Sequence, residues 1–461
     1  MEELTVKVER MAPEGEGIAR PEGSSRVVFI PYSVPGDRLE VSVVSAKSTF
    51  ARARLVKLIE PGPERIEAPC PHHFNALRPG PACGGCDWQQ LSYAAQLKHK
   101  REIVLDCLSR IAKIRDIPVA ETIASPQAWG YRNKVQIPFG APREGASKPI
   151  AGFYEAGSHR IVDFAQCPVQ PEISTAIALK VKELAGTLRW TIYDPQRGSG
   201  WLRHLYLRTN QKGEALVGIV SRTRDFPKEA EFVAALLAAF PQVVGIHHNV
   251  QPLETSVILG PIWKRLWGAR GLEEKIGKFS FFVSPGAFLQ VNTQAAEKLY
   301  DAALAALTDG GAAFDVAVDI YCGAGTLSLW AAGAAKRVIG VEENQEAVRN
   351  AYANAERNRV KNVRFMAGRA EAILPRLAKS ELAGRCAALV DPPRMGLSVP
   401  VLRCLTLPAF KRIVYVSCDP ATFSRDAAYL ARSGFKLKRV QPLDLFPQTS
   451  HVELVGLFDR P

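Results

Sequence analysis

The chain has 461 residues, of which 47% are hydrophobic and 23% charged, and its formal net charge is +13. This length predicts two or three domains in a globular protein, and no apolar stretch approaches the roughly 20 residues of a membrane span. The acidic start, M-E-E-L, is unlike a secretory signal, so we expect a cytoplasmic protein with no membrane contact and no implied protein partner, whose positive charge suits a polyanion such as RNA.

The first sixty residues predict a small β-barrel. Short strand-like segments, L-T-V-K-V-E-R, R-V-V-F-I-P and R-L-E-V-S-V-V, alternate with turns that contain Gly and Pro. This pattern is typical of an OB-like barrel. The order G-E-G-I-A-R, V-V-F-I-P, V-P-G-D is similar to the TRAM domain, an RNA-binding barrel. We therefore assign residues 1–60 to this barrel, followed by the linker P-G-P-E-R.

Two further domains are expected. Residues 61–285 predict a mixed α+β central domain that carries a cysteine cluster, with a long helix near 91–114. From 286 to 461, buried apolar strands alternate with helix-length segments, which predicts an α/β domain with a parallel, Rossmann-like sheet. The strands are V-A-V-D-I-Y, R-V-I-G-V-E, A-A-L-V-D and R-I-V-Y-V-S.

A glycine turn, C-G-A-G-T, follows the first of these strands and opens a helix. Such a turn lets the backbone approach a cofactor closely. Glu342 ends the next strand, where a carboxylate can accept hydrogen bonds from ribose hydroxyls. The third glycine of the dinucleotide motif is missing, because position 328 is Ser. S-adenosylmethionine is therefore favoured over NAD, and an NAD-dependent oxidoreductase is the disfavoured alternative.

Two other strands end in D-P-P-R (391–394) and S-C-D-P (417–420). Cys418 thus lies at the carboxyl edge of the sheet, where such folds bind ligands. A thiolate there suits methylation of uracil at C5, because its addition to C6 turns C5 into an enolate carbon that attacks a methyl group. A general base must then remove the C5 proton. We expect the site to lower the pKa of Cys418 from its usual value of about 8.5.

Four cysteines have the spacing of metal ligands. Three lie in a loop rich in Pro and Gly, as C-x12-C-G-G-C, and one precedes Pro168. The spacing alone favours zinc, whereas thiol exchange within C-G-G-C lacks the thioredoxin context. His72 and His73 are alternative ligands in the same loop. The four candidate ligands are Cys70, Cys83, Cys86 and Cys167.

The motifs Q-V-N-T, D-I-Y-C-G-A-G-T, D-P-P-R, V-Y-V-S-C-D-P-A-T and F-P-Q-T-S-H-V-E together resemble the family of RNA uridine-C5 methyltransferases over nearly the whole chain. The resemblance implies a class I methyltransferase domain in which Cys418 is the nucleophile and Glu453, in H-V-E, is the general base. It also implies that the helix near 91–114 packs on this domain. A departure is Asp419, where the family usually has Asn. The resemblance also implies contacts to S-adenosylmethionine from Gln290, Tyr321, Glu342 and Asp391, with Thr326 as a further candidate.

The same resemblance implies a [4Fe–4S] cluster on the four cysteines, with zinc as the alternative. The gap after Cys70 is longer than the usual gap in the family. Because the transfer-RNA branch of the family usually lacks both the barrel and the cysteine loop, the resemblance implies 23S ribosomal RNA rather than transfer RNA as the substrate. From another class, the chain is alternatively a non-catalytic RNA-binding or ribosome assembly factor, against which the intact Cys418 and Glu453 argue.

Overall fold

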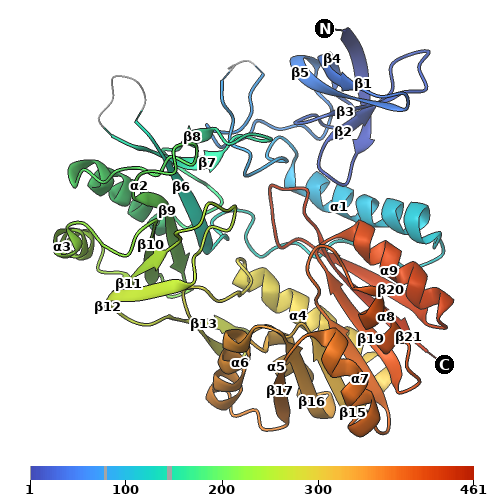
Figure 1. Cartoon of the computed structure of the whole chain (residues 1–461). Coiled ribbons are helices and arrows are strands. Elements are labelled where there is room, and N and C mark those ends of the chain that lie inside the picture. The colour runs from blue at the N-terminus through green and yellow to red at the C-terminus, as the bar shows by residue number, and fades with distance from the viewer. Residues whose placement is uncertain (1, 77–79, 143–147, 461) are drawn as a thin grey trace.

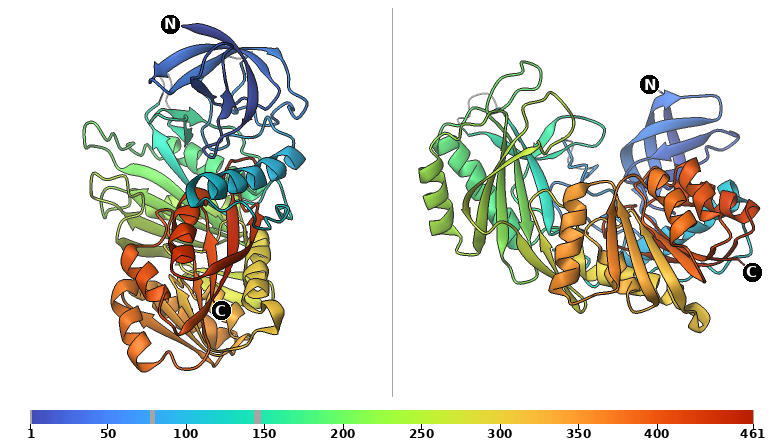
Figure 2. Two further views of the ribbon diagram at one scale, coloured as in Figure 1. Left: turned by 90° about the vertical axis from the view of Figure 1, so that its right-hand side faces the viewer. Right: turned by 60° about the horizontal axis from the view of Figure 1, so that its bottom comes forward.

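The computed structural model describes residues 2–76, 80–142 and 148–460. A small barrel, a central sheet and a C-terminal α/β domain follow one another along the chain (Figure 1). The central sheet lies beside the C-terminal domain, and the barrel lies next to helix α1 (Figure 2).

The N-terminal barrel is closed, with the strand order β1-β2-β3-β5-β4, which confirms the predicted OB-like barrel. Alternate side chains fill its interior, among them Val8, Val28 and Leu39, each no more than 2% exposed. Because side chains alternate across a strand, the charged residues between them face solvent. The strands are β1 (Glu3–Met11), β2 (Gly17–Ala19), β3 (Val27–Ile30), β4 (Arg38–Ala46) and β5 (Phe50–Glu60).

The predicted long helix is present as α1 (Tyr93–Cys107), continued by the π-helical turn η1 (Leu108–Ala112). The Ser92 hydroxyl caps its N-terminus by accepting a hydrogen bond from Ala95 N. Val104 and Leu108 join the hydrophobic core on one face of the C-terminal sheet. The helix therefore packs on the C-terminal sheet, although the central domain follows it in the sequence.

The central domain contains a seven-stranded sheet in the order β12-β11-β10-β9-β6-β7-β8. Ile177 and Val181 of α2 and Phe232 of α3 pack in one core with Leu205 and Val217 of the sheet. The elements are β6 (Lys134–Gly140), β7 (Ile150–Tyr154), β8 (Ile161–Asp163), α2 (Glu172–Thr187), β9 (Leu202–Thr209), β10 (Ala215–Ser221), α3 (Glu229–Ala239), β11 (Val243–Val250) and β12 (Ile262–Gly268).

The C-terminal sheet has the order β17-β16-β15-β18-β19-β21-β20, in which β21 alone runs against its neighbours. Helices α4, α5 and α6 cover one face, and α1, α7, α8 and α9 cover the other. This confirms the predicted Rossmann-like domain. Its strands are β15 (Phe314–Ile320), β16 (Ala335–Glu342), β17 (Val363–Ala367), β18 (Cys386–Val390), β19 (Phe410–Ser417), β20 (Lys436–Leu443) and β21 (Glu453–Asp459). Its helices are α4 (Thr293–Leu307), η2 (Asp309–Gly311), α5 (Thr326–Ala331), α6 (Gln345–Arg357), α7 (Ala370–Ser380), α8 (Val399–Leu405) and α9 (Pro420–Arg432).

A hairpin, β13 (Leu272–Ile276) and β14 (Phe279–Val283), precedes this domain. Its apolar side chains Ile276, Phe279 and Phe281 belong to the core of the C-terminal sheet. Asn354 of α6 and Asn358, the residue directly after this helix, accept hydrogen bonds from the hairpin backbone, each at 2.9 Å. We therefore propose a domain boundary before Leu272 rather than at residue 286.

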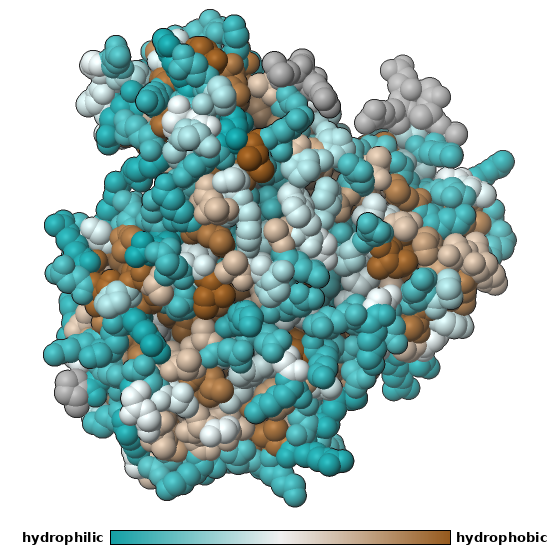
Figure 3. Space-filling view, turned by 180° about the vertical axis from the view of Figure 1, so that it is seen from behind, coloured by the Kyte–Doolittle hydropathy of each residue, from teal (hydrophilic) through white to brown (hydrophobic). Residues whose placement is uncertain are grey.

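The surface opposite to the view of Figure 1 is mostly hydrophilic, with hydrophobic residues scattered among polar ones (Figure 3). Within the described ranges, no helix has both the length and the hydropathy that crossing a bilayer requires.

Candidate active site

A cavity of about 1520 Å³ opens at the carboxyl ends of β15, β16, β18 and β19. Ligands bind at this edge of open α/β sheets, because the loops that follow the strands converge there. Six of the seven predicted catalytic and cofactor residues line it, namely Gln290, Tyr321, Glu342, Asp391, Cys418 and Glu453.

The glycine turn after β15 forms one wall of this cavity. Tyr321 and Gly325 both have left-handed backbone conformations, with φ of 68° and 82°. A Cβ atom at Gly325 would lie 2.9 Å from the Phe365 ring, so only glycine fits at this close approach. The Glu342 carboxylate accepts hydrogen bonds from Gly323 N (3.1 Å) and from the backbone N–H two residues after it (2.9 Å). These bonds fix the acid at the end of β16, beside the turn.

Thr326 is the predicted residue that the structure does not bring to the cavity. It is the first residue of α5, and its hydroxyl interacts with the buried Tyr300 of α4. Ser328, at the position of the missing third glycine, donates a 2.6 Å hydrogen bond to Asp319. The helix after the glycine turn thus directs its hydroxyls into the protein interior.

Two carboxyl groups with raised pKa values lie at this edge of the sheet: Asp391 lines the cavity, whereas Asp319 is fully buried and does not line it. Burial raises the pKa of Asp319 to about 7, although the hydrogen bond from Ser328 favours its ionised form. Burial and the charge of Asp319 raise the pKa of Asp391 to about 7 as well. Both shifts show that another negative charge is unfavourable here, and that a cationic ligand would be favoured.

Cys418 and Glu453 face each other across the antiparallel pair of β19 and β21. The register pairs Ser417 with Leu454, so the next pair along the ladder is Cys418 and Glu453. Because β21 is reversed, its first residue, Glu453, lies at the carboxyl edge of the parallel strands, and it is only 4% exposed. Asp419 accepts a 2.8 Å hydrogen bond from Thr422 N and caps α9. Asn and Asp serve equally at an N-cap, which explains why Asp is accepted here.

The expected lowering of the Cys418 pKa is wrong for this structure. Burial, followed by the charges of Glu453 and Asp391, raises the pKa of Cys418 to about 11. Burial and the charge of Asp391 likewise raise the pKa of Glu453 to about 8. The position of Cys418 was predictable from the residues around it, whereas its raised pKa depends on two carboxylates, Glu453 and Asp391, that belong to other segments of the chain.

Arg394 and His451 are site residues that the sequence analysis missed. Arg394 Nη2 donates a 2.8 Å hydrogen bond to His451 Nδ1, and both line the cavity. A guanidinium is always a donor, so His451 Nδ1 is the unprotonated acceptor. The charge of Arg394 lowers the pKa of both Cys418 and Glu453 and so partly offsets burial. The signal for Arg394 was its place directly after Asp-Pro-Pro.

A second cavity, of about 130 Å³, lies between the cysteine-bearing loop and the central domain. Burial raises the pKa of each thiol that lines it, to about 11 for Cys83. The thiols influence one another electrostatically, which shows that they converge on one space. All four predicted cysteines take part, namely Cys70, Cys83, Cys86 and Cys167.

The two histidines of this loop are engaged in other contacts. His72 Nε2 accepts a hydrogen bond from Ala165 N (3.1 Å), and His73 Nε2 shares one with Gln90 Oε1 (2.9 Å). In the part of the chain that the structure describes, no three His, Cys, Asp or Glu side chains have the arrangement of a single metal-ion site.

The pKa of Cys418 should respond to its charged neighbours in opposite directions. Glu453→Gln removes a charge that opposes the thiolate. At about pH 9.5, where Glu453 is ionised and Cys418 is still mostly protonated, alkylation of Cys418 by iodoacetamide should become roughly threefold to tenfold faster, since the thiolate fraction below the pKa changes tenfold per pKa unit. Arg394→Gln should slow it. Peptide mapping by mass spectrometry measures both, with Cys418→Ser as the blank. Equal rates in all variants would contradict the charge arrangement.

Comparison with known proteins agrees with this geometry. The TRAM domain pattern matches residues 1–56, and the tRNA (Uracil-5-)-methyltransferase pattern matches residues 272–460. RNA methyltransferases of Halalkalibacterium halodurans and Gloeobacter violaceus are 39% and 38% identical to this chain, over 99% of it and 96% of their own lengths.

A solved structure is similar over the whole chain. The tRNA (uracil-54, C5)-methyltransferase of Pyrococcus abyssi, in complex with S-adenosyl-L-homocysteine, superimposes with a TM-score of 0.76 and 26% identity. The match covers 98% of this chain and 100% of the archaeal one. The predicted TRAM barrel and methyltransferase fold are thereby confirmed, and the chain belongs to the family of RNA uracil-5 methyltransferases.

Proposed function

We propose that the protein transfers a methyl group from S-adenosylmethionine to C5 of a uridine in RNA, with Cys418 as the nucleophile and Glu453 as the general base. The observation that carries this proposal is the register of β19 and β21, which brings a thiol and a carboxylate together over one cavity. A thiol and a base are the minimum set for this reaction.

We assign the methyl donor to the part of the cavity that Gln290, Tyr321, Glu342 and Asp391 line. Glu342 ends β16, where a carboxylate meets ribose hydroxyls in such folds. When bound, the donor supplies the methyl group and one positive charge. That charge suits a cavity in which the pKa values of Asp391 and Glu453 are raised.

The reaction at the uridine uses both facing residues. The Cys418 thiolate adds to C6, and the electron pair of the C5–C6 double bond moves to C5 and the C4 carbonyl. C5 then forms a bond to the methyl carbon, while the bond between that carbon and the donor's sulfur breaks and S-adenosylhomocysteine is left. Glu453 removes the C5 proton, the double bond re-forms, and the thiolate leaves. A carboxylate whose pKa is raised to about 8 is a stronger base than an ordinary one, which suits this last step. The uridine must leave its stack to expose C6.

For the substrate we propose ribosomal RNA, because the barrel and the cysteine loop resemble the ribosomal branch of the family. Transfer RNA is the second candidate. It is favoured by the archaeal structure, which is named for a transfer RNA target and shares the architecture over 98% of this chain.

We propose that the four cysteines hold a [4Fe–4S] cluster, with zinc as the alternative. One zinc ion would bring four sulfurs to about 2.3 Å from a single point, and the described residues do not show such a site. Four thiols around a cavity of about 130 Å³ fit a larger group. Gln170 lies beside Cys167, where its amide favours the thiolate form. The cluster would be structural, because methyl transfer moves no net electrons.

RNA containing 5-fluorouridine tests both the reaction and the substrate. Fluorine cannot leave as a cation, so an adduct that requires S-adenosylmethionine should survive denaturing electrophoresis with 23S ribosomal transcripts. Cys418→Ala should abolish it, whereas Cys404→Ala, a half-buried cysteine outside the cavity, should not. An adduct that forms with transfer RNA but not with ribosomal RNA would show that transfer RNA is the substrate. Methylation by Cys418→Ala would contradict the mechanism.

Metal analysis tests the cysteine site. Protein purified without oxygen should be brown and contain about four irons and four sulfides per chain, as four thiolates hold such a cluster. Cys83→Ser should lose the iron, and Cys404→Ser should keep it. A colourless protein that contains one zinc ion per chain would show that the four cysteines bind zinc and not an iron–sulfur cluster.

A further inference from the structure

The segment Asp444–Val452 joins β20 to β21 and leads directly into Glu453. It has no regular secondary structure, and Gln448 within it has a φ of 70°. Most of its residues are buried. Its conformation therefore depends on hydrogen bonds from other parts of the chain.

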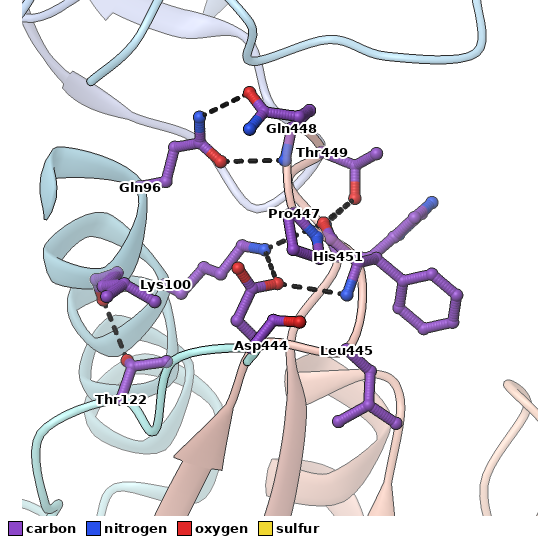
Figure 4. A network of polar contacts seen from close by, with 12 residues as sticks. Gln96, Lys100, Thr122, Asp444, Leu445, Pro447, Gln448, Thr449 and His451 are labelled. Carbon is purple, nitrogen blue, oxygen red and sulfur yellow. Dashed lines mark hydrogen bonds and ion pairs between the residues drawn. The ribbon is translucent and has the colours of Figure 1, made fainter. Parts of the chain in front are cut away.

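Helix α1 supplies one set of these bonds (Figure 4). Lys100 Nζ, which is fully buried, donates to Asp444 Oδ1 (2.5 Å) and to Phe446 O (3.1 Å). The Gln96 amide accepts from Gln448 N (2.8 Å) and donates to Gln448 Oε1 (3.0 Å). The side chains of Gln96 and Lys100 both point from α1 toward this segment (Figure 4).

The cysteine-bearing loop supplies a second set. Asp87 Oδ1 accepts a 3.0 Å hydrogen bond from Ser450 N, and Trp88 N donates to Gln448 O at 3.1 Å. Asp87 directly follows Cys86, one of the four thiols of the second cavity. The contacts therefore connect the thiol cavity to the strand that begins with Glu453.

The barrel contacts both the cysteine-bearing loop and the segment before Glu453. Gly15 O accepts a 3.0 Å hydrogen bond from Trp88 Nε1. A Cβ atom on Gly15 would lie 2.0 Å from Asp87 Oδ2 and 2.9 Å from Ser450 Cβ. The barrel, the cysteine loop and the segment before Glu453 thus meet within van der Waals contact.

We propose that Asp87 and Gln96 are positioning residues that hold Asp444–Val452 in place and thereby set Glu453 for removal of the C5 proton. This inference rests on the proposed function and extends it to a role for the cysteine-bearing loop. Neither residue touches the reacting atoms. They act through backbone N–H groups of the segment, at Ser450 and Gln448.

The two reacting residues depend on different supports. Cys418 follows β19 and precedes α9, whose N-cap is Asp419, so the parallel sheet and this helix hold it. Glu453 is the first residue of β21, next to the segment that Asp87 and Gln96 hold. Loosening the segment should therefore slow proton removal more than thiol addition and methyl transfer.

Asp87→Ala and Asp87→Asn form the matched pair for the test. Both remove the charge, but only Asn keeps an oxygen that can accept from Ser450 N. With ordinary uridine RNA, Asp87→Ala should accumulate the methylated covalent adduct and release product about tenfold more slowly, a loss within the range for misplaced catalytic groups. Asp87→Asn should stay within about threefold of the wild type.

Adduct formation with 5-fluorouridine RNA is the second measurement, because it stops before proton removal. Asp87→Ala should form this adduct at close to the wild-type rate. If it slows both measurements equally, or if Asp87→Asn behaves like Asp87→Ala, the positioning role is wrong. If circular dichroism shows that Asp87→Ala does not fold, Gln96→Ala is measured in its place, and the same results are expected. A wild-type chain without any fluorouridine adduct would contradict the proposed function itself.

Discussion

The reversed direction of β21 is the constraint on which the site depends. In a wholly parallel sheet, the first residue of a seven-residue strand would lie at the opposite edge, roughly 20 Å away at about 3.3 Å per residue. The reversal instead brings Glu453 next to Cys418. Gly456 of β21 makes this pairing compatible with α9, because a Cβ there would lie 2.4 Å from the Phe423 ring. The helix that follows the nucleophile and the strand that begins with the base are thus fitted to each other.

The electrostatics of the cavity changes the pKa values of its carboxyl groups. Burial raises the pKa of Asp391 to about 7 and that of Glu453 to about 8, so both bind protons more tightly in the folded chain than in the unfolded one. Their ionisation therefore opposes folding as the pH rises from about 4 to about 8, and a cation in the cavity would offset that effect. Arg394, which is hydrogen-bonded to His451, partly offsets this effect, because its charge lowers the pKa of Glu453. Burial and the charges of Glu453 and Asp391 raise the pKa of Cys418 to about 11, which favours the protonated thiol.

The sequence was informative wherever the signal was local. Strand patterns with glycine turns predicted the barrel, and apolar strands ending in S-C-D-P predicted the place of Cys418 at the sheet edge. It was uninformative where distant segments meet. The contact of Arg394 with His451, and the raised pKa of Cys418, depend on which charges the fold brings together. Thr326 does not line the cavity, because its position in the glycine motif does not determine the direction in which the following helix points its hydroxyl group.

The central claim is that Glu453 removes the C5 proton after methyl transfer, and RNA tritiated at C5 of uridine tests it most directly. The wild-type protein should release one tritium to water for each methyl group transferred. Glu453→Gln should transfer at most about one methyl group per chain, bound through Cys418, with the tritium retained. Release of tritium by Glu453→Gln in step with methyl transfer would contradict the account.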